Sequence, residues 1–181
     1  MPGKPKVIPT ILPLLLSFFA VSVDANPVGM EKMELEATKA YRAGEYQQAI
    51  SIWSDILRQP DLETAKKAEI YSNQAALYRQ IGQPGTAIPT WHQAIAIYRQ
   101  SRDKRSRRLL AAVLVDKAQA HNALGQTDFS VPLSREAIEI ANQDNLTEIE
   151  AVGHQALGNA LTIVGKYEEA IFNYSKVWLL Q

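Results

Sequence analysis

From residue 30 onward, the chain repeats one pattern of apolar and polar positions at helical spacing. The stretch "RAGEYQQAISIWSDI", residues 42–56, contains a glycine, an aromatic residue, a small residue and then an apolar stripe with a tryptophan. Similar stretches surround Gly82, Gly125 and Gly165, and the turn glycines, counted from Gly44, are 38, 43 and 40 residues apart. A recurring period in this range is typical of stacked supersecondary units.

Small residues recur at fixed distances from each glycine. One lies seven places before it and another lies five places after it, where they allow two antiparallel helices to approach closely. Nine places after the glycine, three of the four copies carry an aromatic residue, Trp53, Trp91 or Tyr174, which we expect to fill the space between neighbouring hairpins. The small residues are Ala37, Ala75, Ala118 and Gly158 before the glycine, and Ala49, Ala87, Ser130 and Ala170 after it.

The pattern predicts an all-α fold in which each glycine ends the first helix of a hairpin. A residue without a Cβ best tolerates the left-handed conformation just past a helix end. The next helices in the second and third hairpins are predicted to begin near Thr86 and near Asp128 or Ser130. Pro89 and Pro132 would then lie in first turns, where the missing N–H of proline does no harm.

Residues 30–181 resemble the tetratricopeptide repeat family. The motif of small, glycine, small, aromatic and small residues is complete in "ALYRQIGQPGTAIPTWHQA", residues 76–94 preceded by Ala75, and nearly complete in "GNALTIVGKYEEAIFNYSKV", residues 158–177. The resemblance implies a right-handed α-solenoid of four hairpins with lengthened repeats, at about residues 30–67, 68–110, 111–150 and 151–181. Ser130 and Ser134 depart from the motif, so the third copy is the weakest predicted joint.

In this family, the first helix of each hairpin lines the concave face of the solenoid. Polar side chains on rigid helices suit the binding of an extended peptide or of a partner helix. The alternative is that these positions are polar only because they contact water. The resemblance places the following residues on the concave face: Glu31, Glu34, Thr38, Glu69, Asn73, Arg79, Asp116, Gln119, Asn122, Gln155 and Asn159.

The charge of the chain is balanced, with 19 basic and 19 acidic residues, so no overall field attracts nucleic acid. One basic cluster lies between the second and third hairpins, in "RQSRDKRSRR", residues 99–108, where it could hold an acidic protein segment or another anion. The alternative is a solvated loop that follows the C-terminus of a helix. The basic cluster consists of Arg102, Lys104, Arg105, Arg107 and Arg108.

The sequence shows no constellation of residues for catalysis, for a metal or for a cofactor. It contains no cysteine, and its three histidines have no partner at metal-ligand spacing. Phosphate-binding loops and hydrolase motifs are also missing. We therefore expect a protein that is not an enzyme, has no cofactor and binds a protein or peptide partner rather than nucleic acid.

Residues 1–25 have the parts of a secretory signal peptide. Lys4 and Lys6 precede an apolar run, and small residues precede a cleavage site after Ala25. An uncleaved anchor is the alternative, but the run is short for a span of about 20 residues and contains two prolines. The mature chain, residues 26–181, is therefore expected to be exported, periplasmic or extracellular, and without a membrane span.

The repeats and the signal peptide together predict an exported scaffold that binds a peptide or helical segment on its concave face. The sequence pattern of the repeats is also similar to that of the N-terminal region of bacterial proteins that carry a caspase-like CHAT protease domain. The alternative function is therefore a regulatory or substrate-presenting arm of such a protease. Its catalytic domain would lie outside this chain, since a CHAT domain needs a cysteine.

Three consecutive apolar residues, Trp178, Leu179 and Leu180, lie just before the last residue given, Gln181. Repeat arrays usually finish with a helix whose outer face is polar. Either the chain is a fragment of a longer protein, or a partner or second copy covers this end. We expect self-association through the C-terminal helix.

Overall fold

The computed structural model describes residues 28–180, and every regular element in this part of the chain is an α-helix. The predicted signal peptide, residues 1–25, lies outside the described residues. The helices are α1 (Val28–Arg42), α2 (Tyr46–Leu57), α3 (Thr64–Gln80), α4 (Pro84–Tyr98), α5 (Lys104–Ala123), α6 (Thr127–Gln143), α7 (Thr147–Ile163) and α8 (Tyr167–Leu179).

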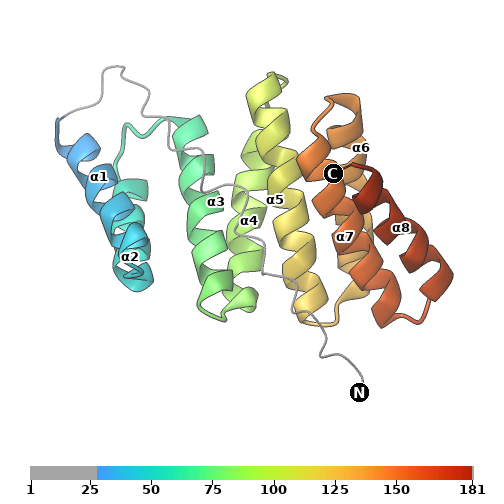
Figure 1. Cartoon of the computed structure of the whole chain (residues 1–181). Helices are drawn as coiled ribbons and strands as arrows, with labels where there is room; N and C mark the ends of the chain where they lie inside the picture. The colour runs from blue at the N-terminus through green and yellow to red at the C-terminus, as the bar shows by residue number, and fades with distance from the viewer. Residues whose placement is uncertain (1–27, 181) are drawn as a thin grey trace.

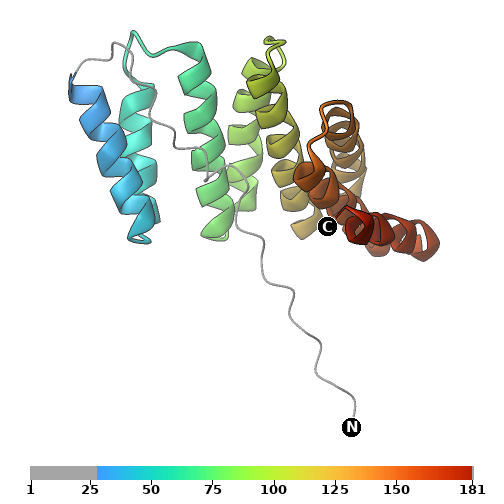
Figure 2. The ribbon, with the colours of Figure 1, turned by 45° about the horizontal axis from the view of Figure 1, so that its top comes forward.

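Consecutive helices pair into four hairpins that follow one another in a row (Figure 1). The first helices of the hairpins form one layer, which contains α1, α3, α5 and α7, and the second helices form the other, which contains α2, α4, α6 and α8. The row of hairpins can also be followed in the turned view (Figure 2). Each hairpin also contacts the next one, for example through α4 and α5. The predicted all-α solenoid of four helical hairpins is therefore confirmed.

The turn glycines have the left-handed backbone that the sequence predicts. Gly82 has φ 77°, and the other three turn glycines have φ between 69° and 79°. The N–H of Gly82 donates to the carbonyl of Arg79 at 3.1 Å, and the N–H of Gln83 donates to the carbonyl of Tyr78 at 2.8 Å. This pair of bonds satisfies carbonyls at the end of α3 and turns the chain sharply into α4.

The predicted first-turn positions of Pro89 and Pro132, in α4 and α6, are wrong. Both helices begin earlier, so that Pro89 and Pro132 are each the sixth residue of a helix and lie in its second turn. The sequence signal for the start of α4 is Pro84, which occupies the first helical position. Neither helix is capped by a side chain, and the hydroxyl of Ser130 donates to Asn122 in the preceding helix instead.

The small residues at fixed distances from the turn glycines lie where the helices of each hairpin cross. Seven of them are alanine or serine with 2% or less of their surface exposed. The eighth, Gly158, has no room for a Cβ, which would lie 2.7 Å from a ring carbon of Tyr174. Trp53 and Trp91 are completely buried, as expected for residues that fill the joints between hairpins.

The third hairpin lacks the large side chain that Trp53 and Trp91 supply in the first two. Ser134 occupies the equivalent position and is completely buried, as is Ser130. Large apolar residues of α5, among them Leu114 and Val115, are buried in the cluster that joins the second, third and fourth hairpins. In the third hairpin the large buried apolar residues therefore lie on α5, which has 20 residues, rather than at position 134 of α6.

Candidate binding surface on the first helices

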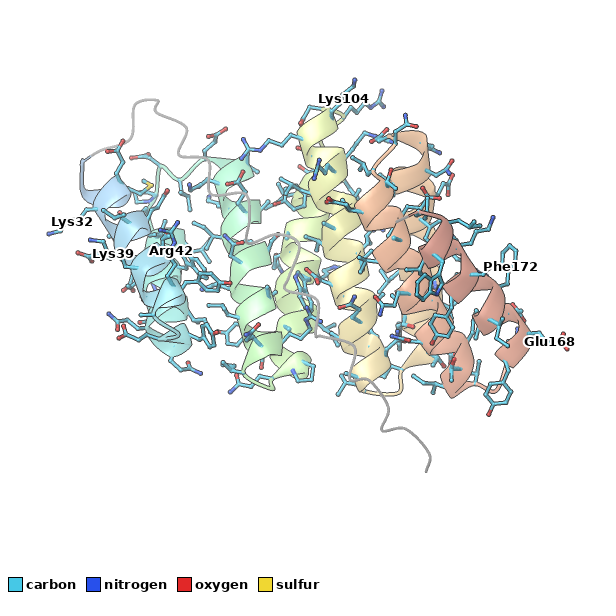
Figure 3. All side chains as sticks on the ribbon, in the orientation of Figure 1. Lys32, Lys39, Arg42, Lys104, Glu168 and Phe172 are labelled. Atoms are coloured by element: carbon cyan, nitrogen blue, oxygen red, sulfur yellow. The ribbon has the colours of Figure 1, made fainter. Side chains whose placement is uncertain are left out.

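All residues that the family resemblance places on the binding face lie on first helices. Glu31, Glu34 and Thr38 lie on α1, and the rest lie on α3, α5 and α7. The side chains of this layer are drawn in Figure 3. The predicted residues therefore all lie in the layer of first helices, but they differ in what they contact.

Several of these residues connect one hairpin to the next. Lys66 donates to the Glu34 carboxylate at 2.7 Å, and Arg105 donates to the Glu69 carboxylate at 2.6 Å. Each bond joins two first helices across 32 or 36 residues of sequence, which is about one repeat. Glu34 and Glu69 therefore stabilise the stacking of the hairpins, in addition to any contact with a partner.

Arg79 forms the most buried of these connections. Its guanidinium donates to Gln119 Oε1 at 2.8 Å and to Asp116 Oδ1 at 3.2 Å. The Asp116 side chain is only 5% exposed, and its Oδ2 accepts no hydrogen bond from the described residues. Burial raises the pKa of Asp116 to about 6, although the positive charge of Arg79 acts in the opposite direction.

Three further predicted residues also take part in the fold. The Asn122 amide donates to the carbonyl of Ala156 at 2.8 Å, which joins α5 to α7. Asn159 accepts a hydrogen bond of 2.7 Å from the Tyr174 hydroxyl, and the Thr38 hydroxyl donates to a carbonyl in its own helix. These groups have partners already and are weaker candidates for contact with a ligand.

Asn73 on α3 and Gln155 on α7 are different. Both side chains are half-buried, and neither forms a hydrogen bond with another described residue. Each amide offers donors and an acceptor, which matches the backbone groups of a peptide. Among the predicted residues on α3, α5 and α7, these two amides are therefore the groups most available for a partner.

The basic cluster does not form the predicted solvated loop. Lys104, Arg105, Arg107 and Arg108 lie in the first turns of α5, and only Arg102 lies in the connection before it. Cations are unfavourable at this end of a helix, because the dipole is positive there. The loop interpretation is therefore wrong, and the charges in this region need carboxylate partners.

Two carboxylates supply these partners, and a third caps the helix. Glu69 binds Arg105, and Asp144 accepts two bonds from Arg107, at 2.8 and 3.1 Å, which hold the pKa of Asp144 below its ordinary value. Asp103 caps α5 by accepting from the N–H of Ser106 at 2.9 Å. Much of the predicted anion-binding charge is thus paired within the chain.

No group of histidine and acidic residues in residues 28–180 could hold a metal ion. Within the same residues, every helix is too short or too polar to span a bilayer. His121 is packed: its Nδ1 lies 2.8 Å from Gln126 Oε1, and its ring stacks on Phe129.

The sequence interpretation missed most of an exposed apolar surface on α8. Of the three apolar residues expected to be uncovered at the end of this helix, Trp178 and Leu179 are exposed, whereas Leu180 is half-buried. Tyr167, Ile171 and Phe172 are exposed as well. Their spacing along the helix places them outside the stripe that packs on α7. That spacing is the feature of the sequence from which their exposure could have been predicted.

Comparison with known proteins supports the family resemblance over part of the chain. Residues 66–143 match the tetratricopeptide repeat family. This segment contains most of α3 and all of α4, α5 and α6. The similarity to CHAT-domain proteins is not confirmed by any of these comparisons, and no curated protein sequence matches the chain.

Solved structures resemble the whole row of hairpins. A crystal structure of MamA is 18% identical, covers 86% of this chain and 80% of its own, and has a TM-score of 0.67. A MamA mutant is 16% identical, with 86% and 75% covered and a TM-score of 0.62. BtubC from P. vanneervenii is 15% identical, with 83% and 76% covered and a TM-score of 0.52. At these identities the similarity shows the shared fold.

The buried carboxyl of Asp116 predicts a pH dependence of stability. Its folded-state pKa, about 6, is above the ordinary value of 3.8, so the folded state binds the proton more tightly than the unfolded chain. The stability that it contributes is complete below the ordinary pKa and is lost as the pH rises through about 6. Asp116→Asn should remove this loss.

Urea unfolding of both proteins, followed by circular dichroism from about pH 5 to about pH 7.5, measures the effect. The unfolding free energy of the wild type should fall relative to that of Asp116→Asn as the pH rises. His121 is present in both proteins, so its titration cancels. A constant difference between the two proteins over this range would contradict the assignment.

Proposed function

We propose that this chain is an exported protein–protein interaction scaffold that binds a peptide or a helical segment on the surface of its first helices. The match of residues 66–143 to tetratricopeptide repeats and the MamA-like fold support a scaffold. The observation that favours this surface is the pair of half-buried amides without hydrogen-bond partners, Asn73 and Gln155, on rigid helices of one layer. The alternative as an arm of a CHAT protease gains no support from the comparisons.

The mode of binding follows from the chemistry of the two amides. An extended peptide presents N–H and C=O groups along its length, and an amide side chain can bind both kinds of group. Because Asn73 and Gln155 lie on α3 and α7, a ligand that contacts both must cross α5. The partner is therefore an elongated segment that spans more than one repeat.

A photo-crosslinking amino acid at position 73 or 155 tests this surface. The chain carrying it in place of Asn73 or Gln155 should capture a discrete protein from the cells that produce it. Placed at Glu136, a half-buried residue of α6 in the second layer, the same group should capture little. A crosslinker at Gln119 should capture the partner in the otherwise unchanged chain. Adding Asn73→Arg and Gln155→Arg to that chain should abolish the capture.

Equal capture from both layers, or capture only from position 136, would contradict binding on the first helices. Retention of the crosslinked product in the double arginine variant would contradict the role of the two amides. Circular dichroism of each variant shows whether it retains the helical fold.

Export is the second part of the proposal. It rests on the charged, apolar and small-residue parts of residues 1–25, which lie outside the described residues. Protein recovered from the periplasm or medium of a secreting bacterial host should begin at or near Asn26 on N-terminal sequencing. A protein that stays in the cytoplasm with Met1 in place would contradict it.

Self-association through α8 is the third part. It is supported by the exposure of Trp178 and Leu179, since large exposed apolar patches on soluble proteins commonly mark interaction sites.

A further inference from the structure

Two of the joints between first helices are closed by a polar contact at the same pair of repeat places. Arg79, three places before its turn glycine, donates to Asp116, which lies nine places before the next turn glycine. Asn122 takes the same place on α5 that Arg79 takes on α3, and its amide donates to the carbonyl of Ala156, again nine places before the following glycine. The contact therefore recurs with the repeat, although the side chains that form it differ.

The joint between the first and second hairpins does not show this contact. Its equivalent residues are Tyr41 on α1, three places before Gly44, and Asn73 on α3, nine places before Gly82. Both side chains are half-buried, and neither forms a hydrogen bond with another described residue. A phenol hydroxyl and an amide are thus left open at a place that is closed in the next two joints.

Other hydrogen bonds already hold the first two hairpins together. Lys66 on α3 binds the Glu34 carboxylate on α1. The buried amide of Gln74 donates to the carbonyl of Ile50 at 3.0 Å and to the hydroxyl of Ser54 at 2.8 Å, which joins α3 to α2. The stacking of this joint therefore does not use the open hydroxyl and amide, which remain available to another molecule.

The chemistry of the two open groups matches that of a peptide main chain. A phenol hydroxyl can donate and accept a hydrogen bond, and the amide of Asn73 has two donors and one acceptor. Burial, and to a smaller extent Tyr46, raises the pKa of Tyr41, so its hydroxyl keeps the proton that it can donate. Together the two side chains can bind the C=O and the N–H groups of one extended segment.

We propose that Tyr41 and Asn73 form a subsite that binds main-chain groups of an extended partner segment, in place of the contact that closes the next two joints. A helical segment does not fit this role, because the N–H and C=O groups of a helix are bonded to one another. The inference rests on the proposed function. It adds Tyr41 to the binding surface and selects an extended segment over a helical one.

A phage-displayed library of random peptides of about twelve residues, about 40 Å when extended, supplies the probe. The library is selected on the full chain, and the most enriched peptide is labelled for fluorescence anisotropy. Tyr41→Phe should raise the Kd of this peptide about fivefold, because one hydrogen bond is lost. Asn73→Ala should raise it by at least as much.

Tyr71→Phe is the matched control for Tyr41→Phe. Tyr71 is also a half-buried tyrosine of a first helix, but it lies two places before Asn73 and therefore on the other side of α3. Its substitution should leave the Kd unchanged.

Transfer of the closing contact tests the assignment in the opposite direction. Tyr41→Arg combined with Asn73→Asp places the residue pair of the next joint at the first joint. This double variant should raise the Kd at least about tenfold, because an arginine–aspartate contact occupies the groups that the segment needs. Circular dichroism shows whether each variant keeps the helical fold.

A peptide that binds equally well to the wild type, to Tyr41→Phe and to the double variant would overturn the subsite and leave the proposed function standing. A peptide that becomes helical when it binds, seen as added helical circular dichroism, would overturn the extended mode. If the wild type enriches no peptide, the proposed function itself fails, and the subsite fails with it.

Discussion

The close approach of two helices at small residues is the constraint on which the rest of this structure depends. In the first three hairpins an alanine of the first helix and an alanine or serine of the second are fully buried where the helices cross. In the fourth, Gly158 lies against the Tyr174 ring with no room for a Cβ. Only when each hairpin closes in this way do Trp53 and Trp91 fill the joints, since interiors pack without voids.

The same stacking explains why so few polar residues of the first helices are available to a partner. Successive first helices lie one repeat apart, within reach of long side chains, so Arg79, Lys66 and Arg105 bind carboxylates on the neighbouring helix. The two end helices of the described row also differ, because α1 carries Lys32 and Lys39 where α8 carries apolar residues.

The sequence predicted the features that depend on local geometry and repetition. Gly82 and its equivalents are required by a left-handed turn, and the small residues are required by the helix crossing, so both recur at fixed spacing. The first-turn positions predicted for Pro89 and Pro132 are wrong, because Pro84 and Thr127 begin these helices and place each proline in the second turn. The pairing of Arg79 with Asp116 had no sequence signal, since it joins residues 37 apart.

The constraint at the helix crossing is tested most directly by comparing Ala118→Leu with Ala96→Leu. Ala118 is completely buried on α5, whereas Ala96 is exposed on α4. Enlarging Ala118 should reduce the unfolding free energy, measured by urea titration, by about 1–3 kcal/mol or more, because the helices cannot separate without opening the joints. Ala96→Leu should change it by less than about 0.5 kcal/mol. Equal effects at the two positions would contradict the account.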